Sequence, residues 1–236
     1  MAKVRLDKII ANQFNVSRKD ARISIKQGKA QVNGQTVRDF SLIVDTNSDI
    51  AFCGQAMEYK KYIYILMNKP KGVLSASNDK SRKTVVDLVP DKWHRAGLFP
   101  VGRLDKDTTG LLIITDDGDF AHKAIAPNKN VYKTYEVTLD GEVTDQMVKD
   151  FANGVTLVDG TLCKKAILYP ISENKAEIKI SEGKYHQIKR MFGTVGLGVN
   201  ELKRTALGGL KLPQELKEGE CRLLGDNEIS LIFTTC

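Results

Sequence analysis

Residues 102–118 read Gly-Arg-Leu-Asp-Lys-Asp-Thr-Thr-Gly-Leu-Leu-Ile-Ile-Thr-Asp-Asp-Gly, and this stretch predicts a loop, a buried strand and a turn. The apolar run Leu111–Ile114 is typical of a core strand, and the residues at 116–118 favour a turn that ends it. Asp105 therefore lies in the loop that leads into a rigid element. A carboxylate at the mouth of a buried strand, just after the basic Arg103, is a candidate for chemistry.

Two other interpretations of these aspartates are open. Asp105 and Asp107 can be turn formers whose oxygens accept hydrogen bonds from backbone amides, which is the commonest role of aspartate in a loop. The spacing also resembles a calcium loop, since Asp105, Asp107, Gly110 and Asp116 fall at positions one, three, six and twelve. The calcium interpretation fails because position twelve is not the bidentate glutamate and the preceding residues, which include a proline, cannot be an entering helix.

The length and composition of the chain limit how many domains it can form and which class of protein it belongs to. With 236 residues and 42% hydrophobic side chains, the chain is long enough for one domain of moderate size and a smaller one. The sequence contains no apolar run near the roughly 20 residues that span a bilayer. Its first residues have an early acid and no apolar segment before a cleavage site, so we expect no secretion signal, no membrane and a cytoplasmic location.

Cysteine and histidine usage argues against a metal site. Cys53, Cys163, Cys221 and Cys236 are scattered without a Cys-x-x-Cys pair, and no histidine falls at ligand spacing near them. We therefore expect no metal, and we interpret the cysteines as free buried thiols in a reducing compartment.

The net charge of +7 is confined to residues 1–38. The remaining residues contain equal numbers of basic and acidic side chains. A solvated helical face normally mixes both signs, whereas a nearly pure cationic segment suits a phosphate backbone. The nine basic residues of the segment are Lys3, Arg5, Lys8, Arg18, Lys19, Arg22, Lys26, Lys29 and Arg38.

The same segment predicts a small folded module. Apolar spacing indicates a helix over about 3–13, and a second helix follows from the N-cap Ser17 to Gly28, with Asp20 in a capping-box position. Residues 30–37 predict two short strands around an Asn33-Gly34 turn. Two helices and a hairpin with one basic face resemble the RNA-binding module of ribosomal small-subunit protein four, the alpha-L motif. The resemblance implies RNA-binding roles for Arg5, Arg18, Lys19, Arg22, Lys26 and Lys29.

The rest of the chain predicts a second domain after a polar linker at 54–61. Strands are expected near 62–67, 72–76, 98–102, 110–115, 133–140, 164–170, 175–181 and 199–204. Helices are expected near 84–89, 119–126, 144–153, 184–195 and 226–232, with Asp119 and Thr144 as N-caps. The irregular alternation favours an α+β fold, with a mixed, mainly antiparallel sheet and packed helices. We predict domains at 1–58 and 62–236.

Three further motifs accompany the Asp105 loop. They are Lys133-Thr-Tyr135, Glu182-Gly-Lys-Tyr-His-Gln-Ile-Lys189, and Leu202-Lys-Arg-Thr-Ala-Leu-Gly208. Their order and separations resemble those of the RsuA-type pseudouridine synthases, which also carry the N-terminal RNA-binding module. Asn68-Lys-Pro-Lys-Gly72 fits the same pattern, and the resemblance spans nearly the whole chain.

The resemblance implies a set of roles. Asp105 is the catalytic carboxylate, acting as a nucleophile toward the sugar or base or as the base that starts glycal formation. Lys189 pairs with it, with Arg190 as the fallback cation, because burial disfavours an unpaired carboxylate. Tyr135 stacks on the flipped uracil, and Arg103 and Leu202 contact the substrate. The reaction implies no cofactor.

The implied function is isomerisation of a uridine in ribosomal RNA, by base flipping, as a step of ribosome biogenesis. Lys133-Thr-Tyr135 and the absence of a long basic tail favour 16S rRNA, free or in an assembling small-subunit particle, with 23S rRNA as the alternative; we expect a monomer. A non-catalytic ribosome-associated RNA-binding factor would not need Asp105, Tyr135 and Lys189 together. A metal-dependent nuclease is disfavoured because Asp116 and Asp117 lie beyond the strand.

Overall fold

The computed structural model describes residues 3–126 and 129–234. The chain forms two compact units, Met1–Ile63 with Asp91–Leu98, and Tyr64–Pro90 with Phe99–Cys236. The domain limits 1–58 and 62–236 remain a prediction, and the compact units differ from them by including residues 91–98 in the first unit.

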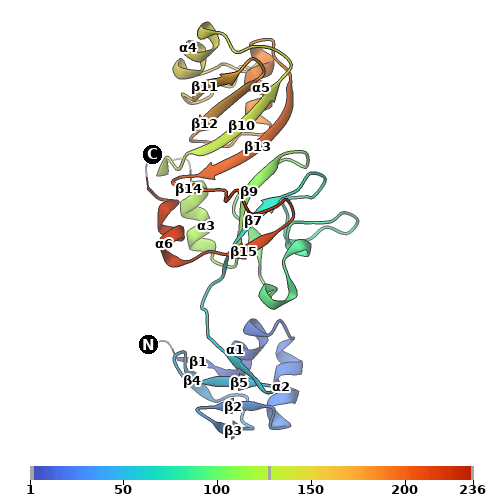
Figure 1. The fold of residues 1–236 in the computed structure, drawn as a ribbon. Coiled ribbons are helices and arrows are strands. Elements are labelled where there is room, and N and C mark those ends of the chain that lie inside the picture. The colour runs from blue at the N-terminus through green and yellow to red at the C-terminus, as the bar shows by residue number, and fades with distance from the viewer. Residues whose placement is uncertain (1–2, 127–128, 235–236) are drawn as a thin grey trace. The chain divides into compact units, whose positions relative to one another are not determined.

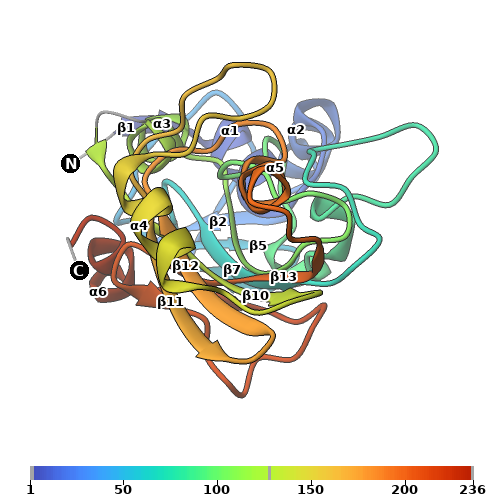
Figure 2. The same ribbon diagram turned by 90° about the horizontal axis from the view of Figure 1, so that it is seen from above.

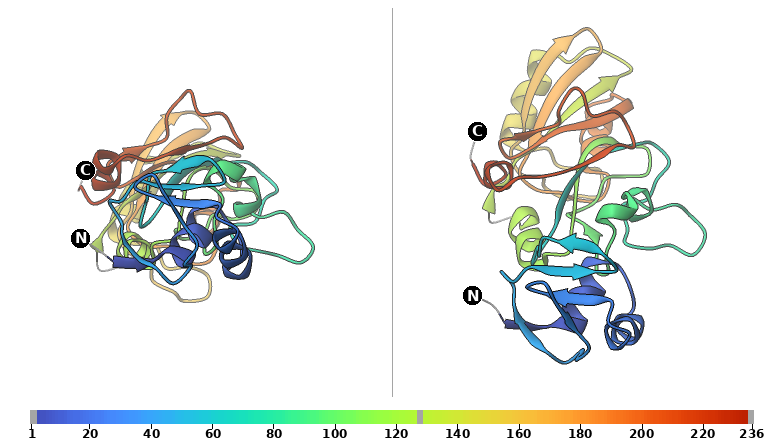
Figure 3. Two further views of the ribbon diagram at one scale, coloured as in Figure 1. Left: turned by 90° about the horizontal axis from the view of Figure 1, so that it is seen from below. Right: turned by 60° about the horizontal axis from the view of Figure 1, so that its bottom comes forward.

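The first unit packs two helices on short strands (Figure 3, right). The strands form a four-stranded sheet of order β3-β2-β5-β6 and a separate pair, β1-β4. Leu6, Ile9 and Ile10 from the first helix and Ile25 from the second are almost fully buried in its core. The elements are β1 (Lys3–Arg5), α1 (Leu6–Gln13), α2 (Arg18–Lys26), β2 (Ala30–Val32), β3 (Gln35–Val37), β4 (Ile43–Asp45), β5 (Ile50–Phe52), β6 (Gln55–Met57) and the 3-10 helix η2 (Asp91–Trp93).

The local signals in this unit are confirmed. The Ser17 hydroxyl accepts a hydrogen bond from the Asp20 amide at 3.1 Å and caps α2. Asn33 and Gly34 both have positive φ, 50° and 76°, as the predicted two-residue hairpin requires. Two predictions are corrected. Helix α1 begins at Leu6 because the residues before it pair with β4, and the polar stretch assigned to a linker contains β6.

The second unit is built on one large sheet of order β11-β12-β10-β13-β9-β7-β15, with β14 on β13 and β8 on β9. Its elements are β7 (Tyr64–Lys69), the 3-10 helix η1 (Val86–Leu88), β8 (Phe99–Pro100), β9 (Thr109–Thr115), α3 (Gly118–Ile125), β10 (Lys133–Leu139), α4 (Asp145–Asn153), β11 (Ile167–Ser172), β12 (Lys175–Ile180), α5 (Gln187–Thr194), β13 (Val199–Leu207), β14 (Leu210–Lys211), β15 (Cys221–Leu223) and α6 (Asp226–Leu231).

The predicted α+β class with a mixed, mainly antiparallel sheet is confirmed (Figure 1). Among the described strands, only β9 and β13 pair in parallel. Helices α4 and α5 lie on one face of strands β10 to β13 (Figure 2), and the rings of Phe151 and Phe192, 5.0 Å apart, join these two helices. Gly110 allows the parallel junction, because a Cβ there would lie 2.2 Å from the Arg204 carbonyl oxygen.

Several predicted elements differ in detail. Residues 72–76 form no named strand but one isolated bridge, Leu74 to Thr84, and the helix expected at 84–89 is a single 3-10 turn. The N-cap of α3 is Asp117, which accepts from the Phe120 amide at 3.1 Å, rather than Asp119. Thr144 caps α4 as predicted. Helix α5 begins three residues later than expected, and β15 was not predicted.

The interpretation of the cysteines as buried thiols is wrong for Cys53. The described cysteines are free, but Cys53 is exposed because it lies in the tight turn between β5 and β6, with φ of 52°. Cys163 is buried, Cys221 is half-buried, and Cys236 lies outside the described residues. Within the described ranges, each helix is too short or too polar to cross a membrane.

Candidate active site

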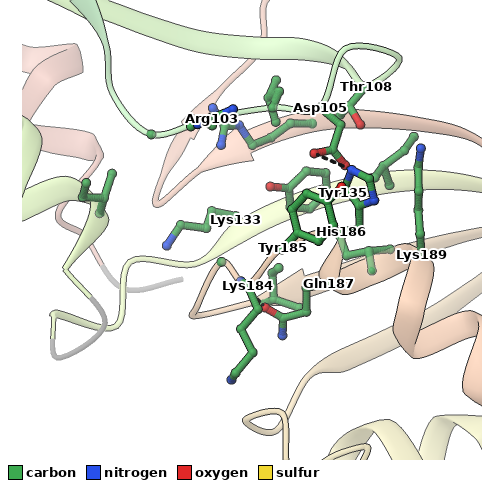
Figure 4. Close-up of a pocket in the computed structure, with 18 of the residues that line it drawn as sticks. Arg103, Asp105, Thr108, Lys133, Tyr135, Lys184, Tyr185, His186, Gln187 and Lys189 are labelled. Carbon is green, nitrogen blue, oxygen red and sulfur yellow. Dashed lines mark hydrogen bonds and ion pairs between the residues drawn. The ribbon is translucent and has the colours of Figure 1, made fainter. Parts of the chain in front are cut away.

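A cavity of about 590 Å³ lies in the second unit and gathers the predicted catalytic and substrate-contacting residues. It is lined by Asp105 and Arg103 from the loop before β9, Tyr135 of β10, Lys189 of α5 and Leu202 of β13. These residues come from segments that are widely separated in the sequence, and Figure 4 shows most of them around one space. A volume of this size lies within the range of small-molecule pockets.

The loop that carries Asp105 is held from beneath by Lys69, the last residue of β7. The Lys69 side chain is fully buried, and its Nζ donates to the carbonyl oxygens of Thr108 at 2.9 Å, Pro70 at 3.0 Å and Lys106 at 3.3 Å. Ser75 adds reciprocal hydrogen bonds to the amide and carbonyl of Leu104. The backbone on both sides of Asp105 is therefore fixed.

The buried position of Lys69 lowers the pKa of its side chain. Burial lowers the pKa of Lys69 from 10.5 to about 8, although the negative charges of Asp107, Asp105 and Glu218 oppose that change. A buried ammonium is tolerated when its N–H groups donate hydrogen bonds, and here three carbonyl oxygens accept them. No sequence pattern singled out this lysine beyond its place in the Asn68–Gly72 motif.

Neighbouring strands form the floor of the cavity. Tyr135 on β10 lies directly opposite Arg204 on β13, and Val137 lies opposite Leu202. Directly opposed residues of an antiparallel pair project to the same face, so Tyr135 and Arg204 share the cavity side. The Arg204 Nε donates to the Leu111 carbonyl at 2.7 Å, while its buried Nη2 has no protein partner among the described residues.

The structure corrects the expected partner of Asp105. Lys189 pairs with Asp107, with Nζ 2.5 Å from Oδ2, and the fallback Arg190 pairs with Asp159. The side chain that approaches Asp105 is His186, whose Nε2 lies 3.5 Å from Oδ1 (Figure 4). The prediction failed because His186 precedes α5 and turns toward Asp105, while Lys189, three residues later, reaches the next aspartate of the loop.

The ionised form of Asp107 is stabilised by its ion pair with Lys189. The hydrogen bond from Lys189 lowers the pKa of Asp107 below its usual 3.8, and the positive charge of that lysine acts in the same direction. The ion pair therefore links helix α5 to the loop before β9.

Lys133 also lines the cavity. The sequence indicates it only as the first residue of the motif Lys133-Thr-Tyr135 and predicts no separate role for it. Burial lowers the pKa of Lys133 from 10.5 to about 8, and the positive charges of Arg204 and Lys164 lower it further. Its Nζ donates to the Val131 carbonyl at 3.0 Å. Figure 4 places Lys133 apart from the Asp105 and His186 pair, so the cavity has a carboxylate region and a cationic region.

The predicted basic face of the first unit contains a buried acid. Asp7 is fully buried and accepts hydrogen bonds from Arg5, Arg18 and Arg22 at 2.7–3.2 Å. Burial alone would raise the pKa of Asp7, but the three arginines outweigh it and hold the pKa below 3.8. The arginines are thus oriented by one carboxylate.

The three predicted lysines of this face, Lys19, Lys26 and Lys29, are exposed. Lys26 has its Nζ 5.3 Å from the centre of the Phe40 ring, and Arg22 lies over the same ring. The unit therefore combines arginines held by Asp7 with exposed lysines.

Known proteins match this chain in both units. Residues 63–194 match a family described as RNA pseudouridylate synthase, and residues 4–50 match the S4 domain. The chain is 39% identical over 233 residues to "Ribosomal small subunit pseudouridine synthase A" of Escherichia coli (strain K12), covering 97% of this chain and 100% of that protein.

Two other similarities cover nearly the full chain. "Uncharacterized RNA pseudouridine synthase YtzG" of Bacillus subtilis (strain 168) is 39% identical over 242 residues, covering 97% of this chain and 98% of that protein. A solved structure described as "Crystal structure of pseudouridylate synthase" has a TM-score of 0.69 and 33% identity, covering 97% of this chain and 99% of that chain.

Proposed function

The chain belongs to the RsuA-type pseudouridine synthases, which are isomerases, and on that basis we propose that it converts one uridine of 16S rRNA to pseudouridine. The observation that supports this proposal best is the meeting of Asp105, Tyr135 and Leu202 in one cavity of about 590 Å³. A protein that only bound RNA would not need a carboxylate and an aromatic ring converging inside such a cavity.

The reaction rearranges bonds without changing composition. The bond between N1 of uracil and C1′ of ribose breaks, the base turns, and C5 bonds to C1′. The proton on C5 leaves and N1 gains one. Asp105 is the proposed catalytic carboxylate. Lys69 and Lys189 fix its loop from two sides, which supports a preorganised geometry.

The target base has to leave its helical stack to reach Asp105. Enzymes that act on a base flip it into a pocket and read it by stacking and hydrogen bonds. Tyr135 is 7% exposed and lines the cavity beside Asp105, so it is the proposed stacking platform, and Leu202 closes the apolar wall. Arg103 lies at the cavity rim and is proposed to occupy the space that the base vacates.

The first unit is the proposed anchor on ribosomal RNA. Arg5, Arg18 and Arg22 are fixed by Asp7, and exposed lysines lie beside them. Such cations bind phosphates and release counterions without reading sequence. The small-subunit relative supports 16S rRNA, either free or within an assembling small-subunit particle in the cytoplasm, and we propose a monomer.

The test is pseudouridine mapping with wild type and Asp105→Asn. In vitro transcripts of 16S and 23S rRNA from the source organism, and small-subunit particles from cells lacking the protein, are incubated with each. We expect one new pseudouridine in 16S rRNA with wild type and none with Asp105→Asn, while the variant keeps its RNA affinity. A product only in 23S rRNA would move the target to the large subunit. If no RNA contained new pseudouridine, the proposed activity would be wrong and the protein would instead be a non-catalytic RNA-binding factor.

A further inference from the structure

His186 adopts a backbone conformation that is uncommon for residues other than glycine. Its φ of 47° and ψ of 35° lie in the left-handed region, which glycine tolerates best and which asparagine, aspartate and histidine adopt more often than other residues do. The residue is the N-cap of α5, but its side chain makes no capping hydrogen bond. Helix capping therefore does not explain why a histidine stands in this position.

The surrounding segment holds this conformation in place. The Gln187 Oε1 accepts from the Lys184 amide at 2.9 Å, and the Gln187 Nε2 donates to Glu182 Oε1 at 2.9 Å. Glu182 also pairs with Lys184, and both Glu182 and Gln187 are buried. A disfavoured backbone conformation persists only when its surroundings determine it in this way, and such residues cluster at functional sites.

The conformation brings the imidazole to Asp105. The His186 Nε2 lies 3.5 Å from Asp105 Oδ1, and the Tyr185 ring stacks on the imidazole at 3.9 Å with an angle of 19° between the planes. Within residues 3–126 and 129–234, His186 is the one side chain paired with the Asp105 carboxylate. Hydrogen bonds of catalytic groups are often long before substrate binds and shorten in the complex.

The other supports of the loop act on different atoms. Lys69 binds the carbonyl oxygens of residues 70, 106 and 108, and Lys189 binds Asp107. Neither of them fixes the rotation of the Asp105 side chain. A carboxylate accepts hydrogen bonds but donates none when ionised, so a hydrogen bond between this pair requires the proton to be on the histidine nitrogen that faces Asp105.

We propose that His186 is a positioning residue for Asp105, whose Nε2–H holds one carboxylate oxygen so that the other faces the base in the cavity. The inference rests on the proposed function, and it adds a residue to the reaction beyond Asp105, Tyr135 and Lys189. In this proposal, the left-handed backbone directs the imidazole into the cavity and toward Asp105.

Two substitutions separate this role from a purely structural one. His186→Gln keeps an N–H donor at about the reach of Nε2 but suits the left-handed backbone no better than histidine. His186→Asn suits that backbone better, but its side chain is too short to reach Asp105. A positioning role therefore predicts that the glutamine variant is the more active one, and a backbone role predicts the reverse order.

The measurement is the single-turnover rate of tritium release from transcripts of 16S and 23S rRNA labelled at C5 of uridine, with enzyme in excess. We expect His186→Asn to be at least 30-fold slower than wild type and His186→Gln to be within fivefold, with unchanged RNA affinity and thermal unfolding for both. His186→Gly, which suits the backbone, should regain at least fivefold in rate with added imidazole, whereas Asp105→Asn should regain none.

The outcomes distinguish this inference from the proposed function. A wild type that releases no tritium from either RNA overturns the proposed function, and this inference with it. If the wild type is active, two results overturn only the role of His186. They are a His186→Asn variant as fast as wild type and a His186→Asn variant faster than His186→Gln. Lack of rescue of His186→Gly by imidazole would overturn it as well.

Discussion

Lys189 of α5 and Asp107 of the loop before β9 form an ion pair, with 2.5 Å between Nζ and Oδ2. The pair joins the helix on one side of the cavity to the loop that carries Asp105. Its Asp107 end is mostly exposed, at 64%, so its contribution to global stability is small. Its effect is therefore expected in the geometry of the loop and not in the free energy of unfolding.

We predict that Lys189→Met and Asp107→Asn lower the single-turnover rate by about tenfold each, equivalent to about 1.4 kcal/mol in the barrier. The double variant should be no slower than either single variant, because both substitutions remove the same link. The free energy of unfolding should change by less than about 1 kcal/mol. A nearly inactive Lys189→Met beside a nearly wild-type Asp107→Asn would show that the lysine acts on Asp105 directly.

Lys133 and Lys69 make a matched pair for a prediction about stability. Burial lowers the pKa of both from 10.5 to about 8, which corresponds to about 3 kcal/mol of unfavourable charge burial at neutral pH. Lys133 donates to one carbonyl oxygen and Lys69 to three. Since each hydrogen bond removed costs about 1 kcal/mol, Lys133→Met should raise the free energy of unfolding by about 2 kcal/mol, and Lys69→Met should not.

The gain in the free energy of unfolding from Lys133→Met should depend on pH in a definite direction. Between pH 8 and 10.5 the unfolded chain binds more protons than the folded protein at both lysines, so their penalty falls as the pH rises. The advantage of Lys133→Met should therefore be largest below pH 8 and shrink toward pH 10.5 in denaturant titrations. The same variant should be less active, because it removes a cation from the cavity. Equal stability of wild type and Lys133→Met at pH 7 would contradict the expected penalty.

Features set by neighbours in the chain were predictable from the sequence. The Ser17 cap, the Asn33-Gly34 turn and the buried strand after the Asp105 loop depend on interactions within a few residues. The predicted catalytic and substrate-contacting residues also meet in one cavity, because the motifs mark the loops, strands and helix that carry them.

Features that depend on distant segments were not predictable. The partner of Lys189 is decided by where α5 begins relative to a loop 82 residues earlier. His186 was overlooked because the sequence does not reveal a left-handed backbone at a histidine, which is fixed here by Glu182 and Gln187. The sequence predicts no role for Asp7, since its burial beneath three arginines requires the folded module.

The exposed lysines of the first unit should bind RNA without supporting the fold. We predict that replacing Lys19, Lys26 and Lys29 by glutamine weakens binding to a 16S rRNA transcript and reduces the salt slope of the affinity by about one for each phosphate that is no longer neutralised. Thermal unfolding should stay unchanged because the three side chains are exposed. Lys175→Gln, on β12 of the second unit, is the control and should leave the slope unaltered. An unchanged slope for the triple variant would exclude these lysines from the RNA-binding surface.

Asp7→Asn should affect stability and RNA binding together. An asparagine offers one acceptor oxygen in place of two and turns an N–H group toward guanidinium groups, so we expect a loss of about 2 kcal/mol in the free energy of unfolding. Arg5, Arg18 and Arg22 would also lose their common orientation, which should weaken RNA binding. The exposed Asp20→Asn is the matched control and should change either property much less.

Acid titration gives this prediction a second readout. The folded-state pKa of Asp7 lies below 3.8, so its contribution to stability is present above that value and is lost as the pH falls through the lowered pKa. The difference between wild type and Asp7→Asn in denaturant titrations should therefore narrow on acidification from pH 5 toward pH 2. A difference that stays constant over this range would mean that the three arginines do not depend on the ionised carboxylate.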